Sequence, residues 1–368
     1  MILVPRWRSQ ALRDVSFLPT HIPGCQLFCC GDTSRFPTAI VVPADPTADG
    51  DFETADMAAW TTSNCLSSKE AGWVGSRCAR IAYDGSHSAG GIYQMRTVVG
   101  NWYRAYGQMR GDGTSAPRFL GDGVTYHWTG TASATPQSFD VTFQAANVYG
   151  PQFNSVNLSA GHYVEVDDFH LVPLNCSQYT DLTGLGHHPV QATAANQPLV
   201  VASGTGHLLR FDGSNDVMAA AFNVSQPYHR FVLAKWTEEA GKTPRLLDGG
   251  SADQSSLYHN NPSGGLARIY AGTLGVSIAW SDATWYVYDV INNGASSGIG
   301  LNGGAQTTGN AGANNLTGVS LGAISGGGVG GCSKSDIAAV IVYNRVLSES
   351  ERQRVIRYLS RLKQRLAL

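Results

Sequence analysis

Apolar and polar residues alternate along much of this chain, and this is the pattern of β-strands that have one buried face. The clearest example is residues 102–110, where Tyr103, Ala105 and Met109 fall on one face. A strand directs successive side chains to opposite faces, so the intervening residues form the second face. That second face carries Trp102, Arg104, Tyr106, Gln108 and Arg110. We therefore predict a strand with an apolar inner face and a polar, aromatic outer face.

Further strands are predicted before and after residue 176. Residues 138–144 and 162–172 alternate in the same way, and Gly-Asp-Gly turn signals occur at 111–113 and 121–123. Beyond residue 176 the strand candidates are 208–213, 230–236, 267–270, 284–291 and 337–343. Many short strands separated by turn residues are typical of sandwiches and jelly rolls.

One helix is predicted, at the C-terminal end of the chain. Ser348 and Glu351 have the spacing of a capping box, in which each residue binds the backbone N–H of the other. An apolar stripe at helical spacing follows, made of Val355, Tyr358, Leu359 and Leu362. The helix is therefore expected to bury one face against the last domain.

Composition and order predict two nested domains of all-β class. The 368 residues are enough for two domains, and 43% hydrophobic residues, 43 glycines and only 14% charged residues favour sheets with many turns. Residues 17–36 have the character of an opening strand whose continuation begins near residue 179, and a proline-rich crossing starts at residue 37. We predict an N-terminal arm (1–16), a host β-sandwich (17–36 plus 176–368) with the C-terminal α-helix, and an inserted β-sandwich of jelly-roll type (37–175).

Net charge and hydropathy limit the kinds of partner that we expect this protein to bind. A net charge of about −2 gives no field that attracts nucleic acid, and no apolar stretch approaches the roughly 20 residues of a membrane span. We therefore expect no nucleic acid partner and no membrane insertion. Basic residues do cluster near the C-terminus, and we interpret them as the solvated face of the helix. They are Arg345, Arg352, Arg354, Arg357, Arg361, Lys363 and Arg365.

The first residues and the cysteines predict a protein made in the cytoplasm. Arginines follow the first few apolar residues at once, which differs from a secretory signal. The seven cysteines show no metal-binding spacing, and their odd number leaves at least one unpaired. We expect reduced thiols throughout.

Two family resemblances accompany these patterns. Segments 181–188, 191–198, 209–216 and 336–352 resemble concanavalin A-like lectin or laminin G domains of the type common in bacterial and phage proteins. The insert resembles jelly-roll carbohydrate-binding modules. This second resemblance rests on a box at 49–60 and on an aromatic residue followed by paired acids within 162–171. Both resemblances imply β-sandwich folds, and neither determines the ligand.

The second resemblance implies a structural calcium ion that joins the first box to the last strand. Carboxylate oxygens suit this ion, and the candidate ligands are Asp51 or Glu53 with Asp167 or Asp168. The alternative is that these acids only cap turns and face solvent. No other cofactor is expected.

Aromatic and planar polar side chains suggest a sugar-binding surface, because pyranose rings have apolar faces and hydroxyl-bearing edges. Trp102, Arg104, Tyr106 and Gln108 share one strand face. On the next strand we expect Tyr126 and Trp128 to share a face, with His127 opposite. The alternatives are that these aromatic residues form the sandwich core or a protein interface.

Three enzyme-like motifs fail on their physical requirements. Residues 165–170 approach the Glu-x-Asp-x-x-Glu strand of laminarinase-like hydrolases, but His170 stands where the second catalytic acid is needed. The glycines within 294–303 precede a segment that cannot form the helix that binds a pyrophosphate, so we predict a hairpin there. His187 and His188 have no third metal ligand nearby in the sequence. We expect no catalytic residues and no enzymatic activity.

These observations favour a non-enzymatic virion surface protein, such as a head decoration, spike or tail appendage of a phage or gene-transfer agent. It would bind host cell-surface polysaccharide and reach the outside by lysis. It would bind other virion proteins, in part through the N-terminal arm, and form an oligomer in the particle. The alternatives are a secreted bacterial glycan-binding protein or accessory module of polysaccharide degradation, and a purely structural capsid cement protein.

Overall fold

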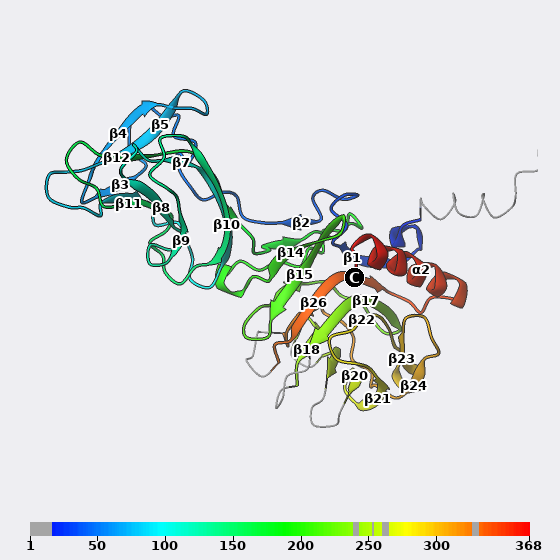
Figure 1. Cartoon of the computed structure of the whole chain (residues 1–368). Helices are drawn as coiled ribbons and strands as arrows, with labels where there is room; N and C mark the ends of the chain where they lie inside the picture. Colours follow the sequence, from blue (N-terminus) through cyan, green and yellow to red (C-terminus); the bar gives the residue numbers. More distant parts are fainter. Residues whose placement is uncertain (1–16, 238–242, 252–253, 260–264, 326–330) are drawn as a thin grey trace, which may run out of the picture. The chain divides into compact units, whose positions relative to one another are not determined.

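The structure is a computed structural model that describes residues 17–237, 243–251, 254–259, 265–325 and 331–368. It is mostly β, with several antiparallel sheets and one α-helix at the C-terminal end, so the predicted fold class is confirmed (Figure 1). The predicted arm, residues 1–16, lies outside the described residues. None of the helices in the described parts is long and apolar enough to cross a membrane.

The described chain forms two compact units. The host unit contains the residues up to Val41 together with Cys176–Leu368, and the insert unit is Val42–Asn175. The insert begins five residues later than the sequence suggested. Ile40 and Val41 form β2 and pair with β13 (Gln178–Tyr179), which keeps them in the host unit.

The host unit contains an eight-stranded sheet, here called the helix-covered sheet. Its strands in spatial order are β14 (Leu199–Ser203), β15 (Gly206–Asp212), β26 (Lys334–Tyr343), β17 (Tyr228–Thr237), β22 (Trp285–Asn292), β23 (Ser297–Leu301) and β24 (Thr307–Gly309). β1 (Cys25–Cys30) pairs with the second half of β26, beyond the residues that pair with β15. Strands encoded more than 300 residues apart are thus neighbours in one sheet.

The second host sheet, here called the six-stranded sheet, packs on one face of the helix-covered sheet. Its order is β16 (Met218–Ala220), β25 (Val319–Leu321), β18 (Arg245–Gly249), β19 (Ser256–His259), β20 (Leu266–Tyr270) and β21 (Leu274–Ala279). Short 3-10 turns complete the host unit at Pro19–His21, Ala194–Asn196 and Gly294–Ser296. The last of these turns connects β22 to β23, which are antiparallel neighbours, so the hairpin predicted at this glycine-rich segment is confirmed.

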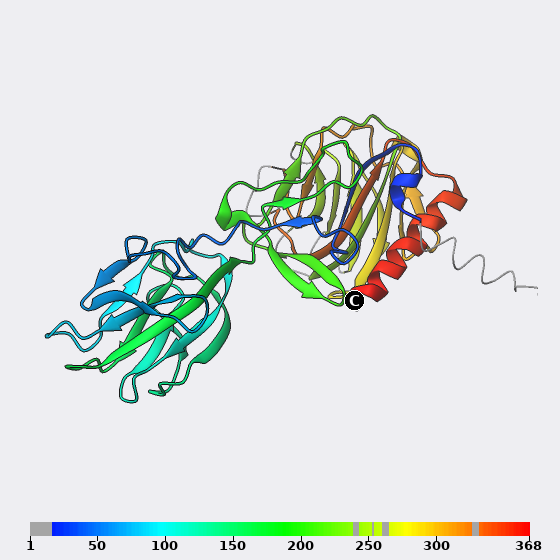
Figure 2. The same ribbon diagram turned by 90° about the horizontal axis from the view of Figure 1, so that it is seen from above.

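Helix α2 (Glu349–Arg365) covers the other face of the helix-covered sheet (Figure 2). The predicted capping box is present, with Ser348 and Glu351 each binding the backbone N–H of the other. The predicted apolar stripe is buried against the sheet together with Phe231 and Ile341. Val232 and Trp236 point to the opposite face, toward the six-stranded sheet. Both faces of the sheet are therefore buried, which explains the continuous apolar runs in β17 and β26.

The interpretation of the C-terminal basic residues as a solvated face is wrong for Arg352. Arg354 and Arg357 are exposed, but Arg352 is only 7% exposed and its side chain binds Asp289 of β22. Its position one residue after the capping box directs its side chain toward the sheet, where the buried carboxylate of Asp289 accepts its hydrogen bond.

The insert unit is a sandwich of two five-stranded sheets. The first, here called the β7 sheet, has the order β10 (Gln137–Gln144), β7 (Trp102–Arg110), β12 (Tyr163–Pro173), β5 (Arg77–Ala82) and β4 (Leu66–Ala71). The second, here called the β8 sheet, has the order β3 (Thr61–Ser63), β6 (Gly91–Tyr93), β11 (Gln152–Val156), β8 (Ala116–Leu120) and β9 (Tyr126–Thr129). An aromatic core that includes Phe119, Phe153 and Phe169 lies between them.

A buried acid, Asp216, lies close to the exposed Asp212 at the end of β15 in the host unit. Asp216 is 7% exposed, and its Oδ2 accepts a hydrogen bond from the backbone N–H of Asp212 (2.9 Å). Burial, with repulsion from the Asp212 carboxylate, raises the pKa of Asp216 to about 8. The folded protein therefore keeps a proton that the unfolded chain releases near pH 4.

We expect the host unit to lose stability as the pH rises from about 4 through about 8, because folding then competes with ionisation of Asp216. Asp216→Asn keeps an oxygen acceptor and removes the ionisation. It is expected to be more stable than the wild type by roughly 1–3 kcal/mol at about pH 8, and by less at about pH 5. Denaturant unfolding of both proteins at the two pH values tests this. An asparagine variant that is less stable at both values would contradict it.

Candidate functional site

The candidate site is the outer face of the β7 sheet. Tyr103, Ala105 and Met109 of β7 are buried in the aromatic core, as predicted. The strand alternation directs the intervening side chains away from this core, and they are partly or fully exposed. They are Trp102, Arg104, Tyr106, Gln108 and Arg110.

Planar groups from three adjacent strands contact one another around Tyr106. Its ring stacks on His170 of β12, with 4.8 Å between the ring centroids. The Arg104 guanidinium carbon lies 5.0 Å from the centroid of the Tyr106 ring. Arg104 also donates from Nε and Nη2 to the two carboxylate oxygens of Asp140 on β10 (2.8 and 2.5 Å). Hydrogen bonding to Arg104 lowers the pKa of Asp140, so this pair stays charged at neutral pH.

A loop residue completes the face at Gln108. Trp73, between β4 and β5, donates from Nε1 to Oε1 of Gln108 (2.9 Å). The guanidinium carbon of Arg110 lies 4.5 Å from the Trp73 ring centroid. The backbone N–H groups of Trp73 and Val74 both donate to Oδ2 of Asp167 (2.9 Å each), which holds the loop on the sheet. Since its oxygen is occupied, Gln108 presents its amide N–H groups for other partners.

Glu165 is the centre of a cross-strand ion network. Its side chain is fully buried, with one oxygen bound by Nε and Nη2 of Arg80 (2.9 and 2.8 Å) and the other by Nε of Arg110 (2.5 Å). The Arg80 guanidinium carbon lies 4.0 Å from the Tyr163 ring centroid. Because both oxygens are occupied, the geometry of Glu165 is that of a structural tie between β5, β7 and β12.

Charge is therefore balanced across this face. Three arginines meet three carboxylates: Arg80 and Arg110 share Glu165, Arg80 also pairs with Glu70, and Arg104 pairs with Asp140. A face of paired charges and aromatic rings suits a neutral, hydroxyl-rich ligand better than a polyanion, since a polyanion binds where cations are in excess.

Tyr126 and Trp128 lie on a different sheet, at β9 of the β8 sheet. Trp128 and Tyr126 pair with consecutive residues of β8, so His127 is an extra residue that forms a bulge. The Trp128 ring packs 5.3 Å from Phe139, and the His127 ring packs 4.4 Å from Phe143. Tyr126 is 53% exposed. The expectation that Trp128 shares a face with Tyr126, opposite His127, is wrong because the bulge breaks the alternation.

The four acids proposed for calcium have different surroundings. Glu53 accepts hydrogen bonds from Ser76, Asp167 accepts the loop amides described above, and Asp168 lies 3.1 Å from His170. Asp51 is exposed. Within the described residues, no group of three or more His, Cys, Asp or Glu side chains is placed to hold a metal ion. Three of these acids accept turn and loop hydrogen bonds, and Oδ1 of Asp167 is buried without a hydrogen-bond partner in the described part of the chain.

The junction expected to hold the metal is closed by other bonds. The carbonyl of Gly50 accepts a hydrogen bond from Phe169 N (2.9 Å), so the first box contacts the last strand directly. Lys69 Nζ lies 2.6 Å from Oδ2 of Asp49 and 2.7 Å from the carbonyl oxygen of Phe52. The side chains of Lys69 and Asp49 are only 4% and 2% exposed. An ammonium group therefore neutralises the buried carboxylate at this position.

The adjacent histidines and the cysteines are the remaining chemically reactive side chains singled out by the sequence, and their contacts are those of structural residues. His187 donates from Nδ1 to the carbonyl of Gln26 (2.7 Å), and His188 Nδ1 accepts from the backbone of Asp181 (2.9 Å). All seven cysteines are free thiols, as predicted. Burial raises the pKa of Cys30 to about 11 and that of Cys78 to about 12, which keeps these thiols protonated and unreactive.

The comparisons with known proteins show no family for this chain. No family model matches the chain, and no curated protein matches it in sequence. Trypanosoma rangeli sialidase in complex with sialic acid is similar with a TM-score of 0.38 and 13% identity, over 82% of this chain and 53% of the sialidase. The binding domain of botulinum neurotoxin DC in complex with SialylT is similar with a TM-score of 0.33 and 9% identity, over 45% of this chain and 47% of that chain. The chain thus spans about half the length of these structures.

Proposed function

We propose that the insert unit binds glycans across the outer face of the β7 sheet and that the protein acts by adhesion rather than by catalysis. The observation that carries the proposal is the ordered layer of aromatic and planar polar groups around Tyr106 and Gln108. Sugar rings need both kinds of contact, because their faces are apolar and their edges carry hydroxyls.

Each group has a distinct role in this proposal. Trp102 supplies apolar surface for a ring face. Gln108 donates its amide N–H groups, whose orientation Trp73 sets. The Arg104–Asp140 pair offers a donor beside an acceptor to neighbouring hydroxyls. Because these contacts exist before binding, little side-chain entropy remains to be lost when a glycan arrives.

Trp102→Ala and Gln108→Ala are each expected to weaken glycan binding at least about tenfold, which corresponds to about 1.4 kcal/mol. A glycan array identifies the ligand, and titration calorimetry with that glycan measures the loss. Tyr126→Ala is the matched control, because this exposed aromatic residue lies on the β8 sheet. Its affinity is expected to equal that of the wild type. A wild type that binds no glycan, or an equal loss in Tyr126→Ala, would refute the proposed face.

The setting that we propose is the surface of a virus particle, where the protein attaches the particle to host cell-surface polysaccharide. Seven free cysteines support this setting, since they suit a protein made in a reducing cytoplasm. Cosedimentation of the protein with particles, followed by glycan binding of those particles, tests it. Glycan binding without particle association would favour a secreted binding protein, and particle association without glycan binding would favour a capsid cement protein.

A further inference from the structure

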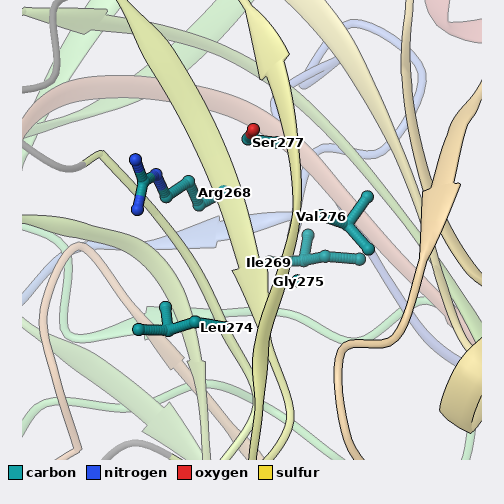
Figure 3. A pocket seen from close by; sticks show the side chains of 6 residues that line it. All are labelled: Arg268, Ile269, Leu274, Gly275, Val276 and Ser277. Carbon is teal, nitrogen blue, oxygen red and sulfur yellow. The ribbon is translucent and has the colours of Figure 1, made fainter.

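A second candidate ligand site lies on the host unit. A hollow of about 220 Å³ is present at β20 and β21 of the six-stranded sheet (Figure 3). It is lined by Arg268, Ile269, Leu274, Gly275, Val276 and Ser277. This volume is below the roughly 300–1,000 Å³ of pockets for drug-sized ligands, so the hollow suits one sugar ring or a smaller molecule.

Polar side chains cross this part of the sheet in one row. Arg245, Tyr258, Arg268 and Ser277 are direct partners across β18, β19, β20 and β21. The Arg245 guanidinium carbon lies 5.0 Å from the ring centroid of Tyr258. Directly opposite residues on neighbouring strands are about 5 Å apart, so the backbone positions of Arg268 and Ser277 are adjacent to this arginine–tyrosine pair.

Arg268 is the unexplained member of the row. Its Nε atom is buried and has no hydrogen-bond partner in the described part of the chain. The strands β18–β21 contain one acidic residue, Asp248, whose Oδ1 accepts hydrogen bonds from Ser256 and Gly249. In Figure 3 the side chains of Arg268 and Leu274 lie on one side of the strands, and those of Ile269 and Val276 lie on the other. Arg268 itself is partly exposed, so the rest of its guanidinium group can reach a ligand, and a buried N–H donor without a partner indicates a missing acceptor beside it.

We propose that this row is a binding site for the carboxylate of an acidic sugar residue. A guanidinium group presents parallel N–H donors that match the two oxygens of a carboxylate. Ser277 is placed to bind a ring hydroxyl, and Leu274 provides apolar surface beside it. This site is independent of the proposed face on the insert unit, where the arginines are already neutralised. The chain would thus recognise a neutral sugar and an acidic sugar at separate positions.

The test uses the full chain and three probes: glucuronate, its methyl ester and glucose. The ester and glucose keep the ring but lack the negative charge. Binding is followed by NMR through the methyl signals of Leu274, which lines the hollow on the same side of the strands as Arg268. We expect saturable shifts with millimolar glucuronate and at least about tenfold weaker binding of both neutral probes, a difference of about 1.4 kcal/mol.

Arg268→Gln is expected to weaken glucuronate binding at least about tenfold. Arg357→Gln is the matched control, because it removes one exposed arginine from α2, and its affinity is expected to stay unchanged. Three outcomes would overturn the proposal: no saturable shift with glucuronate, equal binding of the methyl ester, or acetate binding as tightly as glucuronate. The comparison of acid and ester uses only the wild type, so it decides the matter even if the Arg268 variant folds poorly. Variants at Trp102 and Gln108 are expected to leave these methyl shifts unaltered.

Discussion

Replacing Arg352 with alanine is expected to lower the free energy of unfolding of the host unit by about 3–5 kcal/mol, because it leaves a buried carboxylate without its cation. Asp289 is fully buried on β22, and its Oδ2 accepts a hydrogen bond from Nε of Arg352. Its Oδ1 lies 2.5 Å from Nε2 of His229 and accepts from Gln306 (3.1 Å). The carboxylate therefore has three side-chain partners under helix α2.

Arg352 is the member of this cluster that supplies positive charge. The backbone N–H of Leu347 donates to Nδ1 of His229 (3.3 Å), which leaves Nε2 as the ring atom that donates to Asp289. Arg352 also donates to the carbonyl of Gly304 (2.8 Å) and to Glu349. Removal of this one side chain thus breaks the polar attachment of α2 to the sheet at several points.

Denaturant unfolding of Arg352→Ala and of the exposed control Arg357→Ala measures the effect. The control is expected to stay within about 0.5 kcal/mol of the wild type, since surface substitutions seldom exceed this. Hydrogen exchange of α2 is expected to rise in Arg352→Ala alone. Equal losses of stability in the two variants would show that the Asp289 pair contributes nothing beyond helix propensity.

The sequence predicted the elements whose causes are local. The capping box at Ser348 and the apolar stripe of the helix act within a few residues, and both are present. The alternation of β7 likewise depends only on the period of a strand, and it placed Arg104, Tyr106 and Gln108 on the outer face correctly. Such patterns are visible in one chain because neighbouring residues are enough to produce them.

The sequence did not predict the features that depend on pairing between distant strands. Trp73 binds Gln108, which is 35 residues away, and Arg352 binds Asp289, which is 63 residues away. Neither pair leaves a periodic signal. The bulge at His127 is a third case, because one extra residue reverses the faces of the residues after it. The outer face could thus be predicted strand by strand, but its loop residue and its ion network could not.

Lys69→Met is expected to destabilise the insert unit by about 3–5 kcal/mol, because it leaves the buried carboxylate of Asp49 without its counterion. Methionine keeps the length and apolar character of the lysine stem, so little packing is lost. Asp49 retains a hydrogen bond from Thr54 N (3.0 Å), which is insufficient to balance a full charge at 2% exposure. The carbonyl of Phe52 also loses its donor.

The double variant Asp49→Asn/Lys69→Met separates the charge from the packing. It removes both charges and keeps an oxygen for Thr54, so we expect it to recover much of the stability lost in Lys69→Met. Hydrogen exchange of β5 and β12 reports on the insert unit specifically. In the wild type, calcium and a chelator are expected to leave the unfolding midpoint unchanged, because Lys69 already neutralises Asp49. A midpoint that rises with calcium would support a metal site in the insert unit. A double variant as unstable as Lys69→Met would show that lost packing, rather than an unpaired charge, causes the defect.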